Sequence, residues 1–192
     1  MTSSTQDPLR CFIAIELPEA VQERLLEIQD ALKGHIPRAS WVKRGNIHLT
    51  LKFLGDTSPE ATEAIGAALT SVAARHAAFS LTFGGVGAFP SLARPKTVWV
   101  GVKTGEPNAA RLAQELDDVL KLLGFPPEKR RFNAHVTLAR LRAPADLSDF
   151  KKEKFETIDG STLEVSAIAL IQSELHPKGA IYTTLSTYPL AS

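Results

Sequence analysis

A four-residue pattern occurs twice in this chain: His48-Leu49-Thr50-Leu51 returns, much later, as His135-Val136-Thr137-Leu138. Successive side chains of a β-strand point to opposite faces of a sheet. The histidine and the threonine of each copy therefore share one face, while the aliphatic residues share the other. Each copy predicts a strand that carries an imidazole beside a hydroxyl on one face and packs its other face into a core.

The segments around the two copies recur in the same order: strand, helix, motif strand, helix, strand. In the first half we predict a strand at 11–17, helices at 18–34 and from 57 to about 75, and a strand at 79–86 that runs into a glycine-rich turn. In the second half we predict a strand at 97–102, helices at 107–124 and near 146–152, and strands at 163–171 and 180–185. The motif histidine follows the start of the first strand by 37 residues in the first half and by 38 in the second. This agreement favours an internal duplication.

Composition limits what such a chain can be. With 192 residues, of which 44% are hydrophobic, it can form one substantial core or two small lobes. Lys and Arg total 22 against 21 for Asp and Glu, which excludes a protein that binds nucleic acid through overall basicity. The single cysteine, Cys11, excludes an internal disulfide and is expected in the core. The polar residues 1–8 are expected to form a flexible tail, and the lack of a long apolar run predicts a cytoplasmic protein that does not enter a membrane.

Two His-Thr pairs that face one cleft suit in-line phosphoryl transfer, in which the attacking and leaving oxygens lie on opposite sides of phosphorus. At neutral pH a neutral imidazole can accept a proton from the nucleophile while a charged one donates a proton to the leaving oxygen. The hydroxyls of Thr50 and Thr137 would bind the non-bridging oxygens. This scheme needs no metal and no other cofactor, and the sequence contains no His-Glu-x-x-His pattern, no cysteine pair and no Asp-rich loop.

Further segments surround the two motifs and carry a family resemblance over nearly the whole chain: 10–15, 41–42, 46–55, 94–102, 132–140 and 173–175, with Gly179 and Tyr182. On these residues the chain resembles the two-histidine (2H) phosphoesterase superfamily, and within it the bacterial and archaeal RNA 2′,3′-cyclic phosphodiesterases, which are similar to 2′-5′ RNA ligases. The resemblance implies an α+β fold of two lobes related by a pseudo-two-fold axis. Two antiparallel sheets would line a central cleft, with helices on their outer faces. We expect one such domain over 9–192, and a monomer.

The resemblance also implies an activity. The substrate would be an RNA end or a nucleotide with a 2′,3′-cyclic phosphate, which water opens to a 2′-phosphomonoester. His48 would protonate the departing 3′ oxygen and His135 would activate the water, although a pseudo-symmetric site could run in either direction. Arg140 matches a family arginine associated with the phosphate, and Phe53 matches an aromatic residue that stacks on the base. Each follows its motif histidine by five residues, which on a regular strand is the opposite face, so each must reach the cleft through a bend or a strand end.

The chain departs from the family pattern at two places. Proline is common ahead of the first motif and directly before the second histidine, where this chain has Lys43-Arg44-Gly45 and Ala134. Together with Lys129-Arg130-Arg131, the basic residues could form a local patch for RNA, or they could lie in solvated loops. Other functions stay open: a phosphodiesterase for small cyclic nucleotides, a 2′-5′ RNA ligase, or a non-catalytic RNA-binding module on the same fold.

Overall fold

The computed structural model describes residues 8–36, 38–150, 158, 161–177 and 179–191. The described elements follow the chain in this order: β1 (Leu9–Glu16), α1 (Glu19–Lys33), β2 (Ala39–Trp41), β3 (His48–Thr57), α2 (Ala61–Ala73), β4 (Phe79–Phe89), β5 (Thr97–Thr104), α3 (Glu106–Leu122), β6 (His135–Leu141), β7 (Leu163–Val165), β8 (Ala167–Glu174) and β9 (Ile181–Pro189). The tail expected at 1–8 lies outside the described residues except for Pro8.

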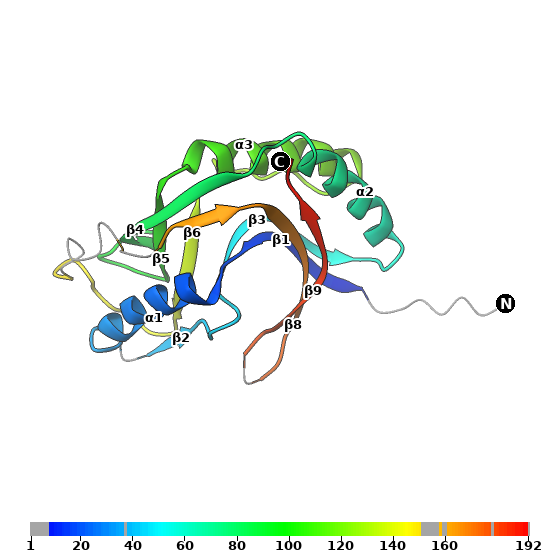
Figure 1. The fold of residues 1–192 in the computed structure, drawn as a ribbon. Coiled ribbons are helices and arrows are strands. Elements are labelled where there is room, and N and C mark those ends of the chain that lie inside the picture. The colour runs from blue at the N-terminus through cyan, green and yellow to red at the C-terminus, as the bar shows by residue number, and fades with distance from the viewer. Residues whose placement is uncertain (1–7, 37, 151–157, 159–160, 178, 192) are drawn as a thin grey trace.

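The strands form one curled sheet in the order β7-β4-β5-β6-β3-β1-β8-β9, with β2 added beside β6. All of these strand pairs are antiparallel. The family resemblance implied two sheets. The described strands instead join in one, because the two motif strands β3 and β6 pair with each other at Leu49 and Val136. Figure 1 shows the sheet as an arch with α2 and α3 along its outer side, and α1 beside β2 and β6 at one foot of the arch.

The curl of the sheet brings its two ends together. Strands β7 and β8 lie near opposite ends of the strand order, yet only Ser166 separates them in sequence. The strand expected at 163–171 is therefore interrupted at this residue, because its first part pairs with β4 and its second with β1. Backbone bonds close the same region: the N–H of Leu190 donates to the carbonyl of Ser166 at 2.8 Å, and the N–H of Ala78 donates to that of Ala191 at 3.0 Å.

One main hydrophobic cluster lies on the helix-covered face of the sheet. Val21, Leu25, Ile28 and Leu32 are buried on α1 at helical spacing, and Leu112, Leu116 and Leu120 are buried on α3. Both sets belong to the cluster that contains the sheet residues Leu49 and Val136. Burying each such aliphatic side chain stabilises the fold by about 1.5–3 kcal/mol. Because side chains alternate along a strand, the histidines and threonines of the motifs face away from this core.

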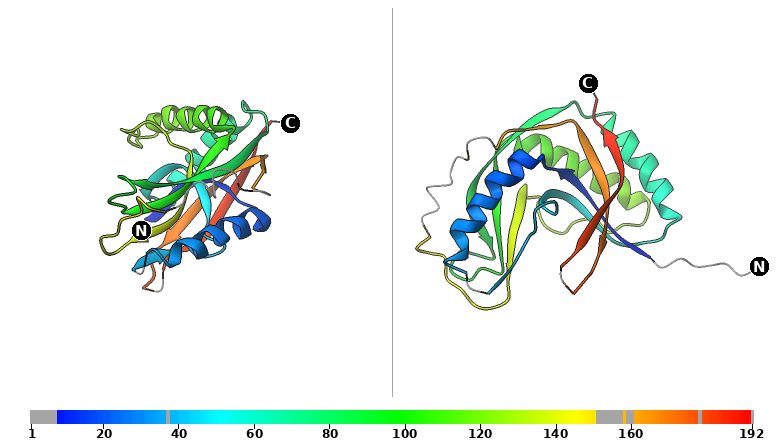
Figure 2. Two further views of the ribbon diagram at one scale, coloured as in Figure 1. Left: turned by 90° about the vertical axis from the view of Figure 1, so that its left-hand side faces the viewer. Right: turned by 60° about the horizontal axis from the view of Figure 1, so that its bottom comes forward.

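The helices cross over between the two halves of the chain. Helix α1 precedes the first motif but packs against β6, and α3 precedes the second motif but packs against β3. The left view of Figure 2 shows α3 at the top of the molecule and α1 toward the bottom. Each motif strand therefore packs against a helix from the other half of the chain. No helix among the described residues is long and apolar enough to span a membrane.

Two local expectations were wrong. The glycine-rich segment 84–87 does not form a turn but lies inside β4, where the register against β5 shifts between Gly84 and Val86 and Gly85 has a φ of +74°. A bulge with a left-handed glycine explains why this segment resembled a turn in the sequence. The short helix expected near 146–152 is absent from its described part, 146–150, and residues 151 and 152 lie outside the described residues.

Candidate active site

Each motif histidine is held by the backbone just ahead of it. The Nδ1 of His48 lies 2.8 Å from the carbonyl oxygen of Asn46, and the Nδ1 of His135 lies 2.7 Å from the carbonyl oxygen of Asn133. A carbonyl oxygen can only accept, so Nδ1 carries the proton and donates in both cases. The Nε2 of each ring is left as the atom that accepts a proton when the ring is neutral and donates one when it is charged.

The sheet brings the two motifs side by side. Leu49 of β3 pairs with Val136 of β6, and the strands are antiparallel. Extending this register by one residue in each direction sets His48 opposite Thr137 and Thr50 opposite His135. The four residues expected at the site therefore lie on one face of adjacent strands. Within the first motif, the Nε2 of His48 is 3.0 Å from the hydroxyl of Thr50.

A β-bulge in β3 turns Phe53 toward this face. The pairing of β3 with β1 skips Leu51, since Thr50 and Lys52 pair with adjacent residues of β1. An extra residue inverts the alternation beyond it, so Phe53 shares the face of Thr50. Its ring lies 6.1 Å from that of Phe12 and is 59% exposed, and Phe12 stacks on the ring of His48 at 4.7 Å. The bulge is the bend that Phe53 needs to reach the face of His48 from a position five residues further along the strand.

A β-bulge also occurs at the matching position of β6. The pairing of β6 with β5 skips Leu138, because Thr137 and Ala139 pair with adjacent residues of β5. Beyond this bulge, Arg140 lies on the face of His135 and is exposed. Burial lowers the pKa of both motif histidines most, the backbone hydrogen bonds oppose this effect, and the positive charge of Arg140 lowers both pKa values further.

The helix of the opposite half braces each bulge. On α1, the side-chain amide of Gln29 donates to the carbonyl of Leu138, the skipped residue of β6, at 3.0 Å. On α3, Asp117 forms an ion pair with Lys52, which follows the skipped residue of β3 and has a side chain only 1% exposed. Lys52 also donates to the carbonyl of Pro126 at 3.0 Å. These paired polar groups hold the local backbone in place, because a movement that broke a pair would leave a buried polar or charged group without a partner, at a cost in folding free energy.

The two histidines differ in their electrostatic surroundings. Burial lowers the pKa of each below its usual value, and the hydrogen bond to a carbonyl partly opposes this effect. Only for His48 does a carboxylate also act, since Glu16 pairs with it across β1 and β3 and raises its pKa. The hydroxyl of Thr184 donates to this carboxylate at 2.7 Å. The carboxylate therefore favours the protonated form of His48, whereas no carboxylate contributes to the pKa of His135.

Aromatic rings flank both histidines. Tyr182 lies edge-on to His48 at 5.3 Å, which adds a third ring to the pair of Phe12 and Phe53. On the other side, Phe89 lies edge-on to His135 at 5.1 Å, and Trp99 is 5.9 Å from it. A Cβ at Gly87 would come within 2.3 Å of the Trp99 ring, so glycine is required at this position for the indole to lie across the sheet.

Several site residues were not found in the sequence as functional. Asn46 and Asn133 each precede a motif histidine by two residues, so the repeated Asn-x-His-x-Thr spacing was a visible signal. Glu16 gave no such signal, because strand pairing alone brings it to His48. Of the basic residues for which an RNA-binding patch and a solvated loop were both left open, Arg44 pairs with Glu19 of α1 at 2.6 Å. Among the described residues no group of three or more His, Cys, Asp or Glu is arranged to hold a metal ion.

Comparison with known proteins connects this site to a family. The model of the 2′-5′ RNA ligase superfamily matches residues 17–177. A protein of Aeropyrum pernix named RNA 2′,3′-cyclic phosphodiesterase is 36% identical over 171 residues, which are 88% of this chain and 96% of that protein. A protein of the same name from Archaeoglobus fulgidus is 35% identical over 181 residues, 94% of this chain and 99% of its own.

Solved structures agree with this relationship. The crystal structure of the Thermus thermophilus protein TT0787 has a TM-score of 0.80 and 31% identity, and the match covers 95% of this chain and 98% of that one. The crystal structure of E. coli LigT complexed with 3′-AMP also has a TM-score of 0.80, with 26% identity over 97% of this chain and all of the other (100%). The chain therefore belongs to the 2′-5′ RNA ligase superfamily.

Proposed function

We propose that this protein is an RNA 2′,3′-cyclic phosphodiesterase, which opens the cyclic phosphate of an RNA end or a nucleotide to a 2′-phosphomonoester. The observation that carries the proposal is the pair of imidazoles on adjacent strands, each with Nδ1 bound to a backbone carbonyl and Nε2 left for proton transfer. Relatives of this length at 28–36% identity bear the name of that activity, which supports the same chemistry here.

Phosphorus would lie between the two rings. His135 takes a proton from the attacking water as the new P–O bond forms, and His48 gives its proton to the 3′ oxygen as the P–O3′ bond breaks. The carboxylate of Glu16 favours this direction, because it stabilises the charged form of His48. Each proton transfer contributes about 10²–10⁴-fold to the rate.

The remaining groups would bind the substrate. The hydroxyls of Thr50 and Thr137 donate to non-bridging oxygens of the phosphate, and the guanidinium of Arg140 binds it with two parallel hydrogen bonds. Phe53, supported by Phe12 and exposed on its other side, stacks on the base. The scheme uses no metal and no cofactor.

The broader expectations remain proposals. They are a single domain over 9–192 that arose by duplication into two pseudo-symmetric lobes, a monomeric state and a cytoplasmic location. The bulges at Leu51 and Leu138, each three residues after its motif histidine, support the duplication. Size-exclusion chromatography with light scattering tests the monomer.

The decisive experiment is incubation of the purified protein in EDTA with an oligoribonucleotide that ends in a 2′,3′-cyclic phosphate. Formation of the 2′-monophosphate is the expected result. Formation of the 3′-monophosphate would contradict the assignment of the leaving oxygen, and strict dependence on added metal would contradict the metal-free site. A protein that binds this RNA without turnover would instead be a binding module, and one that opens only small cyclic nucleotides would have a different substrate.

A further inference from the structure

The segment ahead of His48 is held by contacts next to the carbonyl that orients this ring. That carbonyl belongs to Asn46, whose side-chain amide donates to the carbonyl of Ala180 at 2.8 Å. The N–H of Gly45 donates to the side-chain oxygen of Gln22 on α1, also at 2.8 Å. The anchor of the first motif histidine is therefore fixed in its immediate neighbourhood.

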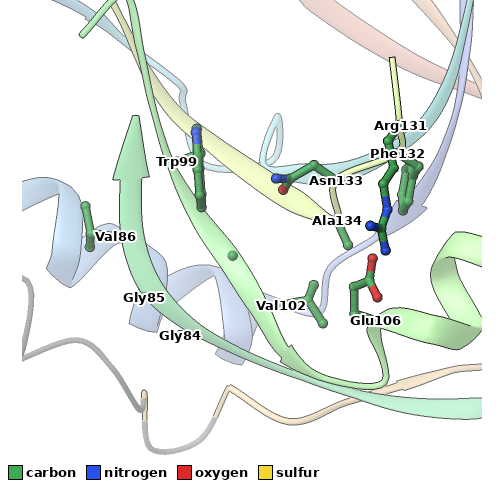
Figure 3. A pocket seen from close by; sticks show the side chains of 11 residues that line it. Gly84, Gly85, Val86, Trp99, Val102, Glu106, Arg131, Phe132, Asn133 and Ala134 are labelled. Carbon is green, nitrogen blue, oxygen red and sulfur yellow. The ribbon is translucent and has the colours of Figure 1, made fainter. Parts of the chain in front are cut away.

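The segment ahead of His135 has no comparable polar contacts. Among the described residues, no side chain of 129–134 makes a hydrogen bond or an ion pair. Phe132 and Ala134 pack against the main hydrophobic cluster, whereas Figure 3 shows Asn133 on the wall of a cavity of about 560 Å³. The position of the Asn133 carbonyl, which orients the second motif histidine, therefore also depends on how the segment is held nearer its start.

Two side chains hold that start. Asp117 of α3 accepts the N–H of Glu128 with both carboxylate oxygens, at 3.1 and 3.2 Å. Lys52 of β3 donates to Asp117 and to the carbonyl of Pro126, the latter at 3.0 Å. Pro126 and Pro127 have no N–H, so Glu128 offers the first backbone donor after them. The ion pair therefore holds the backbone on both sides of Pro127.

This ion pair connects the two motifs. Lys52 directly follows the first motif, and beyond the bulge at Leu51 its side chain reaches α3. The segment that it holds leads into the second motif, and Glu128 precedes Asn133 by five residues. If the segment were released, each freed residue would regain conformational entropy. In many of the conformations then sampled, the carbonyl of Asn133 would no longer meet the Nδ1 of His135.

We propose that Lys52 and Asp117 are positioning residues for His135, because they hold the segment 126–133 where the carbonyl of Asn133 accepts from Nδ1. Without the pair, Nδ1 loses its acceptor for part of the time, and in a fraction of the molecules Nε2 carries the proton instead. A neutral ring in that form cannot accept a proton from the attacking water. The effect on the ring is independent of the reaction, whereas the effect on the rate rests on the proposed function.

The test compares two double variants by the ring ¹⁵N chemical shifts of the histidines, which distinguish the Nδ1–H from the Nε2–H tautomer. Lys52→Met/Asp117→Leu removes the pair and keeps apolar packing, a replacement that often costs little stability. Lys33→Met/Asp30→Leu makes the same changes in an exposed pair on α1 and is the matched control. Spectra are recorded at pH 8, where both motif rings are neutral because their pKa lies below 6.5.

In Lys52→Met/Asp117→Leu the ratio of Nδ1–H to Nε2–H should fall about fivefold at His135, which corresponds to the net contribution of one hydrogen bond, and should not change at His48. The kcat for a 2′,3′-cyclic phosphate should fall about tenfold and KM should stay within about twofold, because a misplaced base affects the chemical step more than binding. In the control neither value should change more than about twofold. Equal tautomer ratios or equal kcat values in the two double variants would overturn the proposal.

Asp117→Asn separates positioning from stability. It leaves the buried Lys52 without a counter-charge but keeps an oxygen that can accept the N–H of Glu128. We expect this variant to be less stable than Lys52→Met/Asp117→Leu and yet to keep the parent tautomer at His135. A tautomer ratio that follows stability across the variants would show a general loosening of the fold and would overturn the proposal.

The tautomer measurement also separates this inference from the proposed function. If the ratio at His135 falls as expected but the parent does not open a 2′,3′-cyclic phosphate, the activity is wrong and the positioning role stands. If the parent opens the cyclic phosphate and the ratio does not fall, the positioning role is wrong and the activity stands.

Discussion

At the scale of single residues, the repeated motif contains two histidines that make the same hydrogen bond to a backbone carbonyl but have different neighbouring side chains. Both rings are oriented by a carbonyl two residues earlier, so their reactive nitrogens are set by the backbone. Only His48 has a carboxylate opposite it, which makes a symmetric pair of side chains unequal as acid and base. The proposed direction of proton transfer thus depends on a residue outside the motif.

Replacement of either motif histidine by alanine should lower kcat at least about 10²-fold, because each variant loses one proton transfer. Both rings are only partly buried, so we expect the far-UV circular dichroism to be unchanged. His76→Gln is the control, since His76 bonds to Glu115 away from the site. Near-parent turnover in either motif variant would exclude the two-histidine mechanism.

The rate should depend on pH as a bell whose maximum lies on the acid side of pH 6.5. The pKa of both motif histidines is below that usual value, first because of burial. The base becomes neutral, and the acid loses its proton, at lower pH than free imidazoles would. A profile of kcat/KM against pH checks this, and a maximum above pH 7 would contradict it.

Glu16→Gln should move the alkaline limb of that profile further toward acid pH. The carboxylate raises the pKa of His48, so its removal lowers that pKa and the acid is lost earlier as pH rises. The acidic limb, set by His135, should stay in place. Glu174→Gln, at the exposed end of β8, is the matched control. An unchanged alkaline limb would show that Glu16 does not act on the catalytic acid.

The sequence was sufficient to predict that the four motif residues share one face of their strands, because this placement depends only on alternation along a strand. It was not sufficient to predict Glu16 or Tyr182, which reach His48 through pairing between strands far apart in the chain. Asn46 and Asn133 fall between these cases: their spacing was repeated, but their role comes from backbone carbonyls that any residue could supply.

At the scale of elements, the two β-bulges decide which residues can join the site. A regular strand would have turned Phe53 and Arg140 into the core side of the sheet. The extra residues Leu51 and Leu138 reverse that direction, and helices from the opposite halves hold them. Bulges follow from the pairing of neighbouring strands, so the alternation in the sequence could not reveal them. For the same reason the bulge at Gly85 was predicted as a turn.

Lys52→Met should destabilise the protein by about 3 kcal/mol, because it leaves Asp117 partly buried without its cation. Lys33→Met, which breaks the exposed pair with Asp30, should cost less than about 1 kcal/mol. The double variant Lys52→Met/Asp117→Leu should recover much of the loss, since a buried pair can be replaced by apolar residues. Urea denaturation measures all three free energies, and equal losses in the two lysine variants would contradict a bracing role.

At the scale of the whole molecule, one sheet carries both motifs, and the ligand should bridge its two halves. A nucleoside 2′-monophosphate at 100 times its Kd should stabilise the protein by about 2.7 kcal/mol, which is a rise in Tm of about 5–10 °C for a chain of this size. Arg140→Ala should lose most of this shift, whereas Arg24→Ala, on the exposed face of α1, should keep it. Differential scanning fluorimetry measures the shifts in Tm. Equal shifts in both variants would show that Arg140 does not bind the phosphate.

The architecture at this scale was predicted in outline only. The order of most strands and helices followed from periodicity, although β2 was not predicted and the helix expected near 146–152 is absent from 146–150. The helix-covered face followed from alternation. Whether two sets of strands form two sheets or one depends on the contact between Leu49 and Val136, to which local sequence gives no guide. The break at Ser166 was hidden for a related reason: both sides of it have the composition of a strand, and only the position of their partners separates them.

The junction at Ser166 also sets an order of events during synthesis. Until residues 163–174 have left the ribosome, β1 and β4 each lack one of their two neighbours in the sheet. Both motifs have then already been made, but β1, which carries Glu16 and Phe12 to the first of them, is still an open edge with unpaired N–H and C=O groups. Such edges recruit other chains. A product that stops before residue 163 is therefore expected to aggregate rather than to act as a shortened enzyme.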